Sequence, residues 1–301
     1  MSDTIIFSND FDVSKYVLSD LDDVNHKVIC ESDLKYIKGK GTFAKITSLL
    51  SRTQYKKFDK IVVSFSIENI VTLDYIGVNF GKPIVWLWNP LSSMTVKNKF
   101  FFLQYIKKRN IEVWTFDRHD AVKYRFKFHN QIHSEKLISK ELGGKGAFFS
   151  GVDKNRLPIL MKIMSDLSCN NVETNFHIVR DRRKKYSPEF LDLTTDKYID
   201  FKEYLKRAND CEVLVDVVQG SQGGFTLRVI EALFLNKKLI TTDFRIKEYD
   251  FYHRNNVYVY GQEDRALSDF LEAPYQEVLS SLKERYTLTH FMNSVKPTFY
   301  T

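Results

Sequence analysis

A glycine-rich loop followed by a glutamate is the part of this chain best suited to binding a phosphorylated ligand. Gly220, Gly223 and Gly224 separate two apolar runs, and glycine lets the backbone approach a ligand closely. Thr226 follows as a predicted N-cap, so the loop should lead into a helix. The unpaired N–H groups and positive dipole end of a helix N-terminus favour bound phosphate. Glu231 lies one helical turn further on, where its carboxylate can point back toward the loop.

Strands and helices are predicted to alternate along the whole chain, which is typical of a parallel sheet wound on both faces. Apolar, β-branched runs predict strands at 4–8, 60–66, 84–88, 112–116, 147–150, 175–180, 198–201, 212–218 and 238–242. The polar stretch 126–145 predicts a domain boundary. We therefore expect an α/β protein with two Rossmann-like, doubly wound domains, residues 1–140 and 141–301, with the last helix packing back on the first domain.

The segment around the glycine loop resembles the donor-binding segment of GT-B glycosyltransferases. The resemblance rests on Gly224-Phe225-Thr226-Leu227, on Glu231-Ala232-Leu233 and on the strand 238–243. It is specific across about 145–260 and architectural before that. It implies two Rossmann-like domains facing a cleft, with Glu231 on the ribose hydroxyls of a nucleotide sugar and loop amides on its diphosphate. Many retaining members carry a glutamate at the position of Gly223, so inversion and retention both stay open.

The same resemblance implies further donor contacts. Arg180 and Arg182 come just past a predicted strand, where family members place a cation on the diphosphate, although a charge run is also typical of a solvated loop. Ile199 lies in the segment that reads the base through backbone groups. Arg228 either neutralises phosphate or pairs with Glu231. The implied donor-binding set is completed by the loop and the start of its helix, namely Ser221, Gln222, Gly223, Gly224, Phe225 and Thr226.

A turn at Gly151 to Asp153, followed by Lys154 and Arg156, either faces the cleft or is an ordinary turn. In the first domain, Asp10 and Asp117 are the predicted catalytic residues, because both follow strands at the edge where a base could reach an acceptor hydroxyl. Each is equally a turn or capping residue. No DxD pair stands where it would demand a divalent metal, so we expect no metal and no cofactor besides the nucleotide-sugar co-substrate.

Positive charge is concentrated in the first half of the chain. Residues 1–140 contain 22 Lys and Arg against 15 Asp and Glu, so the whole net charge of +7 lies there. A helix over 96–109 is predicted to bury one apolar stripe and to leave further aromatic residues beside lysines, which favours docking to an anionic bilayer. The alternative is a helix buried on both flanks. The predicted stripe is Val96, Phe100, Leu103 and Ile106 or Lys107, and the aromatic residues outside it are Phe101, Phe102 and Tyr105.

Composition indicates a folded globular protein, with 301 residues and a hydrophobic content of 43%. Cys30, Cys169 and Cys211 match no metal or disulfide spacing, which fits a reducing compartment. The N-terminus predicts no signal peptide. We expect a cytoplasmic protein, peripheral at the inner face of the membrane, that binds no nucleic acid.

The predicted function is metal-independent glycosyl transfer from a nucleotide-sugar donor to a glycan or glycolipid acceptor. Runs at 154–160 and 247–252 resemble bacterial enzymes of lipopolysaccharide and surface-polysaccharide biosynthesis, so the expected acceptor is of lipopolysaccharide, O-antigen or capsule type. The alternatives are a nucleotide-sugar epimerase of similar fold and a catalytically silent GT-B-like scaffold. Donor sugar, acceptor and oligomeric state are left open.

Overall fold

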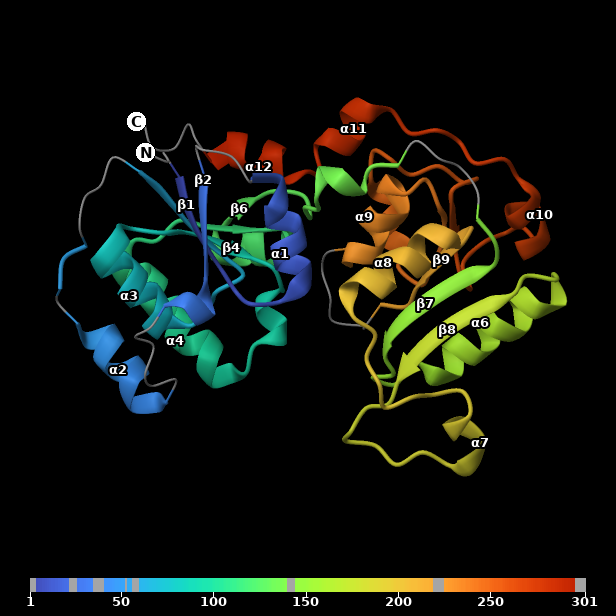
Figure 1. The fold of residues 1–301 in the computed structure, drawn as a ribbon, viewed down its shortest axis with the longest axis horizontal. Helices are drawn as coiled ribbons and strands as arrows, with labels where there is room; N and C mark the ends of the chain where they lie inside the picture. The colour runs from blue at the N-terminus through green and yellow to red at the C-terminus, as the bar shows by residue number, and fades with distance from the viewer. Residues whose placement is uncertain are drawn as a thin grey trace. The chain divides into compact units, whose positions relative to one another are not determined.

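The computed structural model describes residues 4–21, 26–34, 41–51, 53–55, 60–139, 144–218 and 225–295, and it contains two parallel β-sheets with helices packed against them (Figure 1). The strands of the first sheet are β1 Thr4–Ser8, β2 His26–Cys30, β3 Ile61–Phe65, β4 Ile84–Leu87, β5 Val113–Thr115 and β6 Lys127–Phe128. Those of the second are β7 Ala147–Val152, β8 Thr174–Val179, β9 Val213–Asp216, β10 Lys238–Thr241 and β11 Val257–Val259.

Both sheets follow the same winding. The first has the order β2-β1-β3-β4-β5-β6 and the second β11-β10-β9-β7-β8, so each places its first strand between its second and third. This is the doubly wound order, in which ligands bind beyond the carboxyl ends of the first and third strands, at the topological switch point. The predicted α/β class with two Rossmann-like domains is confirmed. The switch points lie at β1 and β3 and at β7 and β9.

The helices cover both faces of each sheet, because alternate residues of a buried strand point to opposite faces. In the first sheet, Val63 and Trp86 belong to one apolar cluster, whereas Val62 and Val85 belong to others. The helices are α1 Asp12–Leu18, α2 Thr42–Leu50, α3 Ile70–Phe80, α4 Val96–Arg109, α5 Arg118–Tyr124, α6 Leu157–Cys169, α7 Pro188–Leu191, α8 Phe201–Asp210, α9 Leu227–Phe234, α10 Leu267–Glu272, α11 Ser280–Glu284 and α12 Leu288–Val295.

The described chain divides into two compact units. The first unit comprises 4–135 and 285–295, and the second comprises 136–218 and 225–284 within the described ranges. Helix α12 therefore belongs to the first unit, where the Phe291 ring lies 4.8 Å from Trp86 and 5.8 Å from Trp114 between ring centroids. The last helix thus fills an apolar face of the first sheet although the second unit precedes it in sequence.

Three features of the fold differ from the sequence-based expectations. Residues 198–200 form no strand, because Asp200 caps α8 by accepting a hydrogen bond from Glu203 N at 2.7 Å. The edge strands β2, β6 and β11 were not predicted. The residues of β2 and β6 are partly exposed and carry little apolar signal, and β11 is only three residues long. Helix α4 buries Phe102, Tyr105 and Ile106. Of the predicted stripe Ile106 is therefore confirmed, whereas Val96 and Phe100 are exposed. The register of α4 is set by i, i+3, i+4 packing of its buried side chains on the apolar cluster that includes Val85 and Leu87.

Candidate functional site

A buried carboxylate at the carboxyl end of β9 organises the switch point of the second sheet. Asp216 is 0% exposed and accepts hydrogen bonds from the Thr226 hydroxyl at 2.9 Å and the Thr241 hydroxyl at 3.2 Å. Arg228 of α9 places Nη1 3.4 Å from Asp216 Oδ1, while its Nη2 donates to the carbonyl oxygen of Ser150 in β7. Burial raises the pKa of Asp216, and the nearby Arg228 guanidinium acts against that rise. The carboxylate therefore joins β7, β9, β10 and α9.

Arg156 contributes a second guanidinium from the turn between β7 and α6. Its Nη1 donates to Val217 O at 3.1 Å, and its Nε donates to Asp153 O at 3.2 Å. The guanidinium carbons of Arg156 and Arg228 each lie 5.0 Å from the ring centroid of Phe149. Burial, with a smaller contribution from Arg228, lowers the pKa of Arg156 to about 10, so it stays charged at neutral pH. This side chain ties the β7 turn to the segment after β9.

Asp153 completes the group beside the same turn. It is 1% exposed, and its carboxylate accepts hydrogen bonds from Leu157 N at 2.7 Å, Lys184 Nζ at 2.7 Å and Tyr186 OH at 2.8 Å. Burial raises its pKa, but the bonds from Lys184 and Tyr186 outweigh burial and hold the pKa of Asp153 below its usual value. We call Asp153, Arg156, Lys184, Asp216 and Arg228 the switch-point cluster. Three cations face two carboxylates in it, so an anion nearby is favoured.

The glycine loop begins and ends at anchored residues. Residues 219–224, and with them the predicted contacts Ser221, Gln222, Gly223 and Gly224, lie outside the described residues. Before the loop, Val218 N donates to Thr242 Oγ1 at 3.0 Å. After it, Phe225 is buried with its ring centroid 3.6 Å from that of Tyr249. Both ends of the loop are therefore held at the carboxyl edge of β9 and β10.

Thr226 and Arg228 occupy the start of α9 as predicted, but their side chains are engaged. Thr226 has the extended backbone of an N-cap, with φ −74° and ψ 159°, and its hydroxyl binds Asp216 instead of capping the helix. The Arg228 guanidinium donates to Asp216 and Ser150, and it also interacts with the Tyr204 hydroxyl and with the charge of Glu231. The sequence analysis predicted a phosphate or Glu231 as the partner of Arg228 and did not predict the buried Asp216.

Glu231 lies in a packed interior. It is 2% exposed, and its Oε2 accepts a hydrogen bond from the Tyr204 hydroxyl of α8. Burial, followed by the charge of Glu231, raises the pKa of Tyr204 well above its usual value, so the phenol keeps its proton. Every residue of α9 from Val229 to Phe234 is buried. The carboxylate therefore has less access to a ligand than its position one turn inside the helix suggested.

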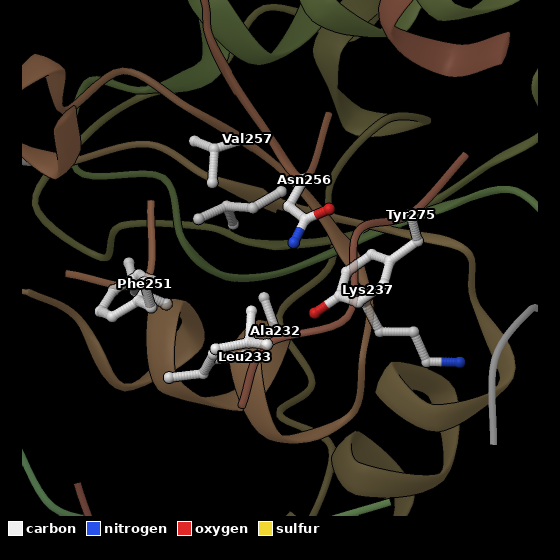
Figure 2. Close-up of a pocket in the computed structure, with 10 residues that line it drawn as sticks. Ala232, Leu233, Lys237, Phe251, Asn256, Val257 and Tyr275 are labelled. Atoms are coloured by element: carbon white, nitrogen blue, oxygen red, sulfur yellow. The ribbon is translucent and has the colours of Figure 1, made fainter. Parts of the chain in front are cut away.

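The opposite face of α9 packs on apolar side chains. A small cavity of about 20 Å³ lies there, and Figure 2 shows Ala232, Leu233, Phe251 and Tyr275 around it. This volume holds about one water molecule. The cavity is a minor gap in the core of the second unit and too small for a nucleotide.

Arg180, Arg182 and Ile199 lie near the end of β8. Arg180 binds Asp196, with its Nε 2.8 Å from Oδ1, and this pair raises the pKa of Arg180. Arg182 is exposed, and Ile199 is half-buried just before α8. The side-chain bonds of Arg180 go to Asp196 and Thr194, outside the switch-point cluster.

Asp10 and Asp117 both have structural partners in the first unit. Asp10 is exposed and accepts a hydrogen bond from Ser32 N at 3.1 Å. Asp117 is 2% exposed and caps α5 by accepting from Asp120 N at 2.9 Å. Asp117, His119 and Asp120 place one ligand atom each within 4.8 Å of one another, but Asp120 also binds Leu91 N at 2.6 Å. The carboxylates of Asp117 and Asp120 thus accept hydrogen bonds from backbone N–H groups. The expected absence of a metal stays a prediction.

The sequence analysis missed Asp216 and Tyr204. It included Lys184 only as a member of the charge run after the predicted strand, and it left Asp153 and Arg156 between two interpretations. One signal was present for Asp216, because it ends the apolar run Val213-Leu214-Val215. An acidic residue at the carboxyl end of a buried strand lies at the edge where ligands bind. No local pattern marks Tyr204, since its partner Glu231 is 27 residues away.

Comparison with known proteins assigns no family. No family model and no curated protein matches the chain. Among solved structures, the chain is similar to the crystal structure of the glycosyltransferase SnogD from Streptomyces nogalater. The two share 11% sequence identity and a TM-score of 0.36, with 80% of this chain and 82% of that chain covered. A TM-score this low carries no functional inference.

Proposed function

We propose that this protein is a glycosyltransferase whose second unit holds a nucleotide-sugar donor at the carboxyl edge of β7 and β9. The observation that supports the proposal is the switch-point cluster, which has one excess positive charge beside the anchored ends of the glycine loop and the start of α9. A diphosphate is the anion that such a loop and helix start favour. The resemblance of 224–243 to GT-B donor segments points to the same ligand.

In this proposal the protein stabilises the leaving group. As the bond between the anomeric carbon and the phosphate oxygen breaks, negative charge develops on the nucleoside diphosphate. Fixed cations and backbone N–H groups stabilise that charge without a metal ion. Loop 219–224 and Thr226 would supply the diphosphate contacts, and the Ile199 segment the base contact. A ribose contact by Glu231 requires its carboxylate to exchange the hydrogen bond from the Tyr204 hydroxyl for one from the ligand. The proposed acceptor is a surface glycan or glycolipid.

Nucleotide binding tests the proposal directly. In a thermal-shift panel of UDP, GDP, CMP and dTDP sugars, one nucleotide should raise Tm, because a ligand that binds only the folded state stabilises it. Glu231→Gln should reduce that shift, and Glu203→Gln, on the neighbouring helix α8, is the matched control that should not. If no nucleotide in the panel raises Tm, the proposal is contradicted. Product analysis without acceptor separates transfer from epimerisation, because an epimerase converts its donor alone.

We also propose a peripheral contact with anionic membrane, made by α2 together with α4. Within the described residues, no helix is both long and apolar enough to cross a membrane. The two helices are joined by hydrogen bonds from Lys97 Nζ to Thr42 Oγ1 at 2.6 Å and from Lys45 Nζ to Asn98 Oδ1 at 2.7 Å. Large apolar side chains are exposed on both, including Phe43 on α2 and Phe100 on α4. Neither helix contains Asp or Glu, so the surface is apolar and basic.

Vesicle sedimentation tests this contact. The protein should pellet with phosphatidylglycerol vesicles at low salt and stay in the supernatant with phosphatidylcholine vesicles, because basic side chains add attraction to anionic headgroups. The double variant Phe43→Ser with Phe100→Ser should pellet several-fold less. A matched control is Val122→Ser, which changes an exposed apolar residue on α5. Equal pelleting by wild type and double variant, or none by wild type, would exclude the surface.

A further inference from the structure

A cavity of about 400 Å³ lies in the first unit, beyond the carboxyl end of β3. Its walls come from α2, from the turn between β3 and α3 with the start of α3, and from α4 with the segment that leads into it. Because β3 is one of the two strands at the switch point of the first sheet, this is an edge where doubly wound proteins bind ligands. The lining residues are Lys45, Glu68, Asn69, Ile70, Met94, Asn98 and Phe101.

Glu68 is the unusual group in this cavity. Its Oε1 atom is shielded from solvent and has no hydrogen-bond partner among the described residues. Burial, with a smaller contribution from the charge of Glu31, raises the pKa of Glu68 to about 7 against the bond from its own backbone N–H. An acceptor atom buried without a donor is costly in a folded protein, and such atoms are uncommon. A ligand that supplies the donor would remove that cost.

The other charged groups near Glu68 are already engaged. Lys45 Nζ donates to Asn98 Oδ1 at 2.7 Å, and Glu31 Oε1 accepts from Thr72 Oγ1 at 3.1 Å. Asn69 Oδ1 caps α3 by accepting from Val71 N at 3.1 Å. None of these three hydrogen bonds involves the Glu68 carboxyl.

The lining favours a ring that carries hydroxyl groups. Ile70, Met94 and Phe101 form an apolar part of the wall, against which the C–H face of a sugar ring can pack. Glu68 with the side-chain amides of Asn69 and Asn98 offers acceptors and donors for hydroxyls. A phosphate or carboxylate ligand is disfavoured, because it would face the Glu68 carboxyl.

We propose that this cavity binds a sugar ring of the acceptor, with one of its hydroxyls donating a hydrogen bond to Glu68 Oε1. The identification of the ring as an acceptor rests on the proposed glycosyl transfer, whereas binding itself does not. Glu68 thereby becomes the residue of the first unit to test in place of Asp10 and Asp117, whose carboxylates have structural partners.

Ligand-observed NMR tests the cavity with methyl glycosides of glucose, galactose, mannose and N-acetylglucosamine. At least one should bind, about fivefold more tightly at pH 8 than at pH 6, because the ionised carboxylate is the stronger acceptor. The Glu68→Gln variant should bind the glycoside at pH 6 and at pH 8 with the lower affinity that wild type shows at pH 6. Met94→Trp, which fills the cavity, should abolish binding, and Lys82→Gln, elsewhere in the first unit, should change nothing. Binding by neither wild type nor control, or unchanged binding and pH dependence in Glu68→Gln, overturns the proposal.

Urea unfolding gives a readout that needs no ligand. A carboxyl whose pKa is higher in the folded than in the unfolded state stabilises the fold below its unfolded pKa, and that stability is lost as pH rises through the folded pKa. Wild type should therefore lose stability between pH 4.5 and 7 relative to Glu68→Gln, which keeps the shape of the side chain. Equal pH dependence of the two proteins would show that Glu68 is not shielded. The thermal-shift panel with nucleotides tests a different site. If no nucleotide binds, the proposed donor site in the second unit is wrong, whereas glycoside binding alone shows whether the cavity at Glu68 binds a sugar ring.

Discussion

Replacing Asp216 by alanine is expected to lower the free energy of unfolding by about 3 to 5 kcal/mol, the largest stability effect we predict. The carboxylate is 0% exposed and faces the Arg228 guanidinium, whose side chain is 11% exposed. Its removal would leave that buried guanidinium without its bonded carboxylate, with only the charge of Glu231 still acting on it. The hydroxyls of Thr226 and Thr241 would lose their acceptor as well. Urea denaturation followed by circular dichroism measures the change.

A double-mutant cycle separates this pair from simple loss of packing. Arg228→Met removes the charge but keeps much of the side-chain volume. In the double variant Asp216→Ala with Arg228→Met no buried cation is left unpaired, so its cost should fall short of the sum of the single costs by about 0.5 to 3 kcal/mol. Additive costs, or a cost below about 1 kcal/mol for Asp216→Ala, would mean that the two side chains are not coupled.

Arg156→Met is expected to weaken binding of the nucleoside diphosphate by about 10- to 100-fold, because we expect the loss of this charge beside the diphosphate to cost as much as one hydrogen bond to a charged group, about 1.5 to 3 kcal/mol. Two effects act together. The variant removes the excess positive charge of the switch-point cluster, and it releases Val217 O, which lies two residues before the glycine loop. Isothermal titration with the nucleotide that responds in the thermal-shift panel measures the dissociation constant.

Two further variants interpret that result. Arg156→Lys retains the charge but cannot reproduce the planar set of hydrogen bonds to Asp153 O and Val217 O. Its affinity for the nucleotide should therefore lie between those of wild type and Arg156→Met. Arg207→Met removes an arginine that pairs with Glu203 on the surface of α8 and should leave affinity unchanged. If Arg156→Met binds nucleotide as wild type does, the cluster is not part of the donor site.

The strands at the centre of both sheets could be predicted because their signal is local. Strands buried on both faces are continuous apolar runs, as in 61–65 and 213–216, and the runs alternate with helical patterns. Thr226 was placed correctly at the N-cap position of α9, but its hydroxyl binds Asp216 and does not cap the helix. The edge strand β2 escaped prediction because its exposed residues carry no such pattern.

The amino-acid sequence by itself determined the α/β class, the central strands of the two doubly wound sheets and the position of a glycine loop before α9. The tertiary structure alone decided which charged groups are open to a ligand and which are held by the protein. Arg228 is bound to Ser150, 78 residues away, and Glu231 to Tyr204, 27 residues away. The physical reason is that a charge takes its partner from whatever packing brings within hydrogen-bond distance, and spacing along the chain does not contain that information.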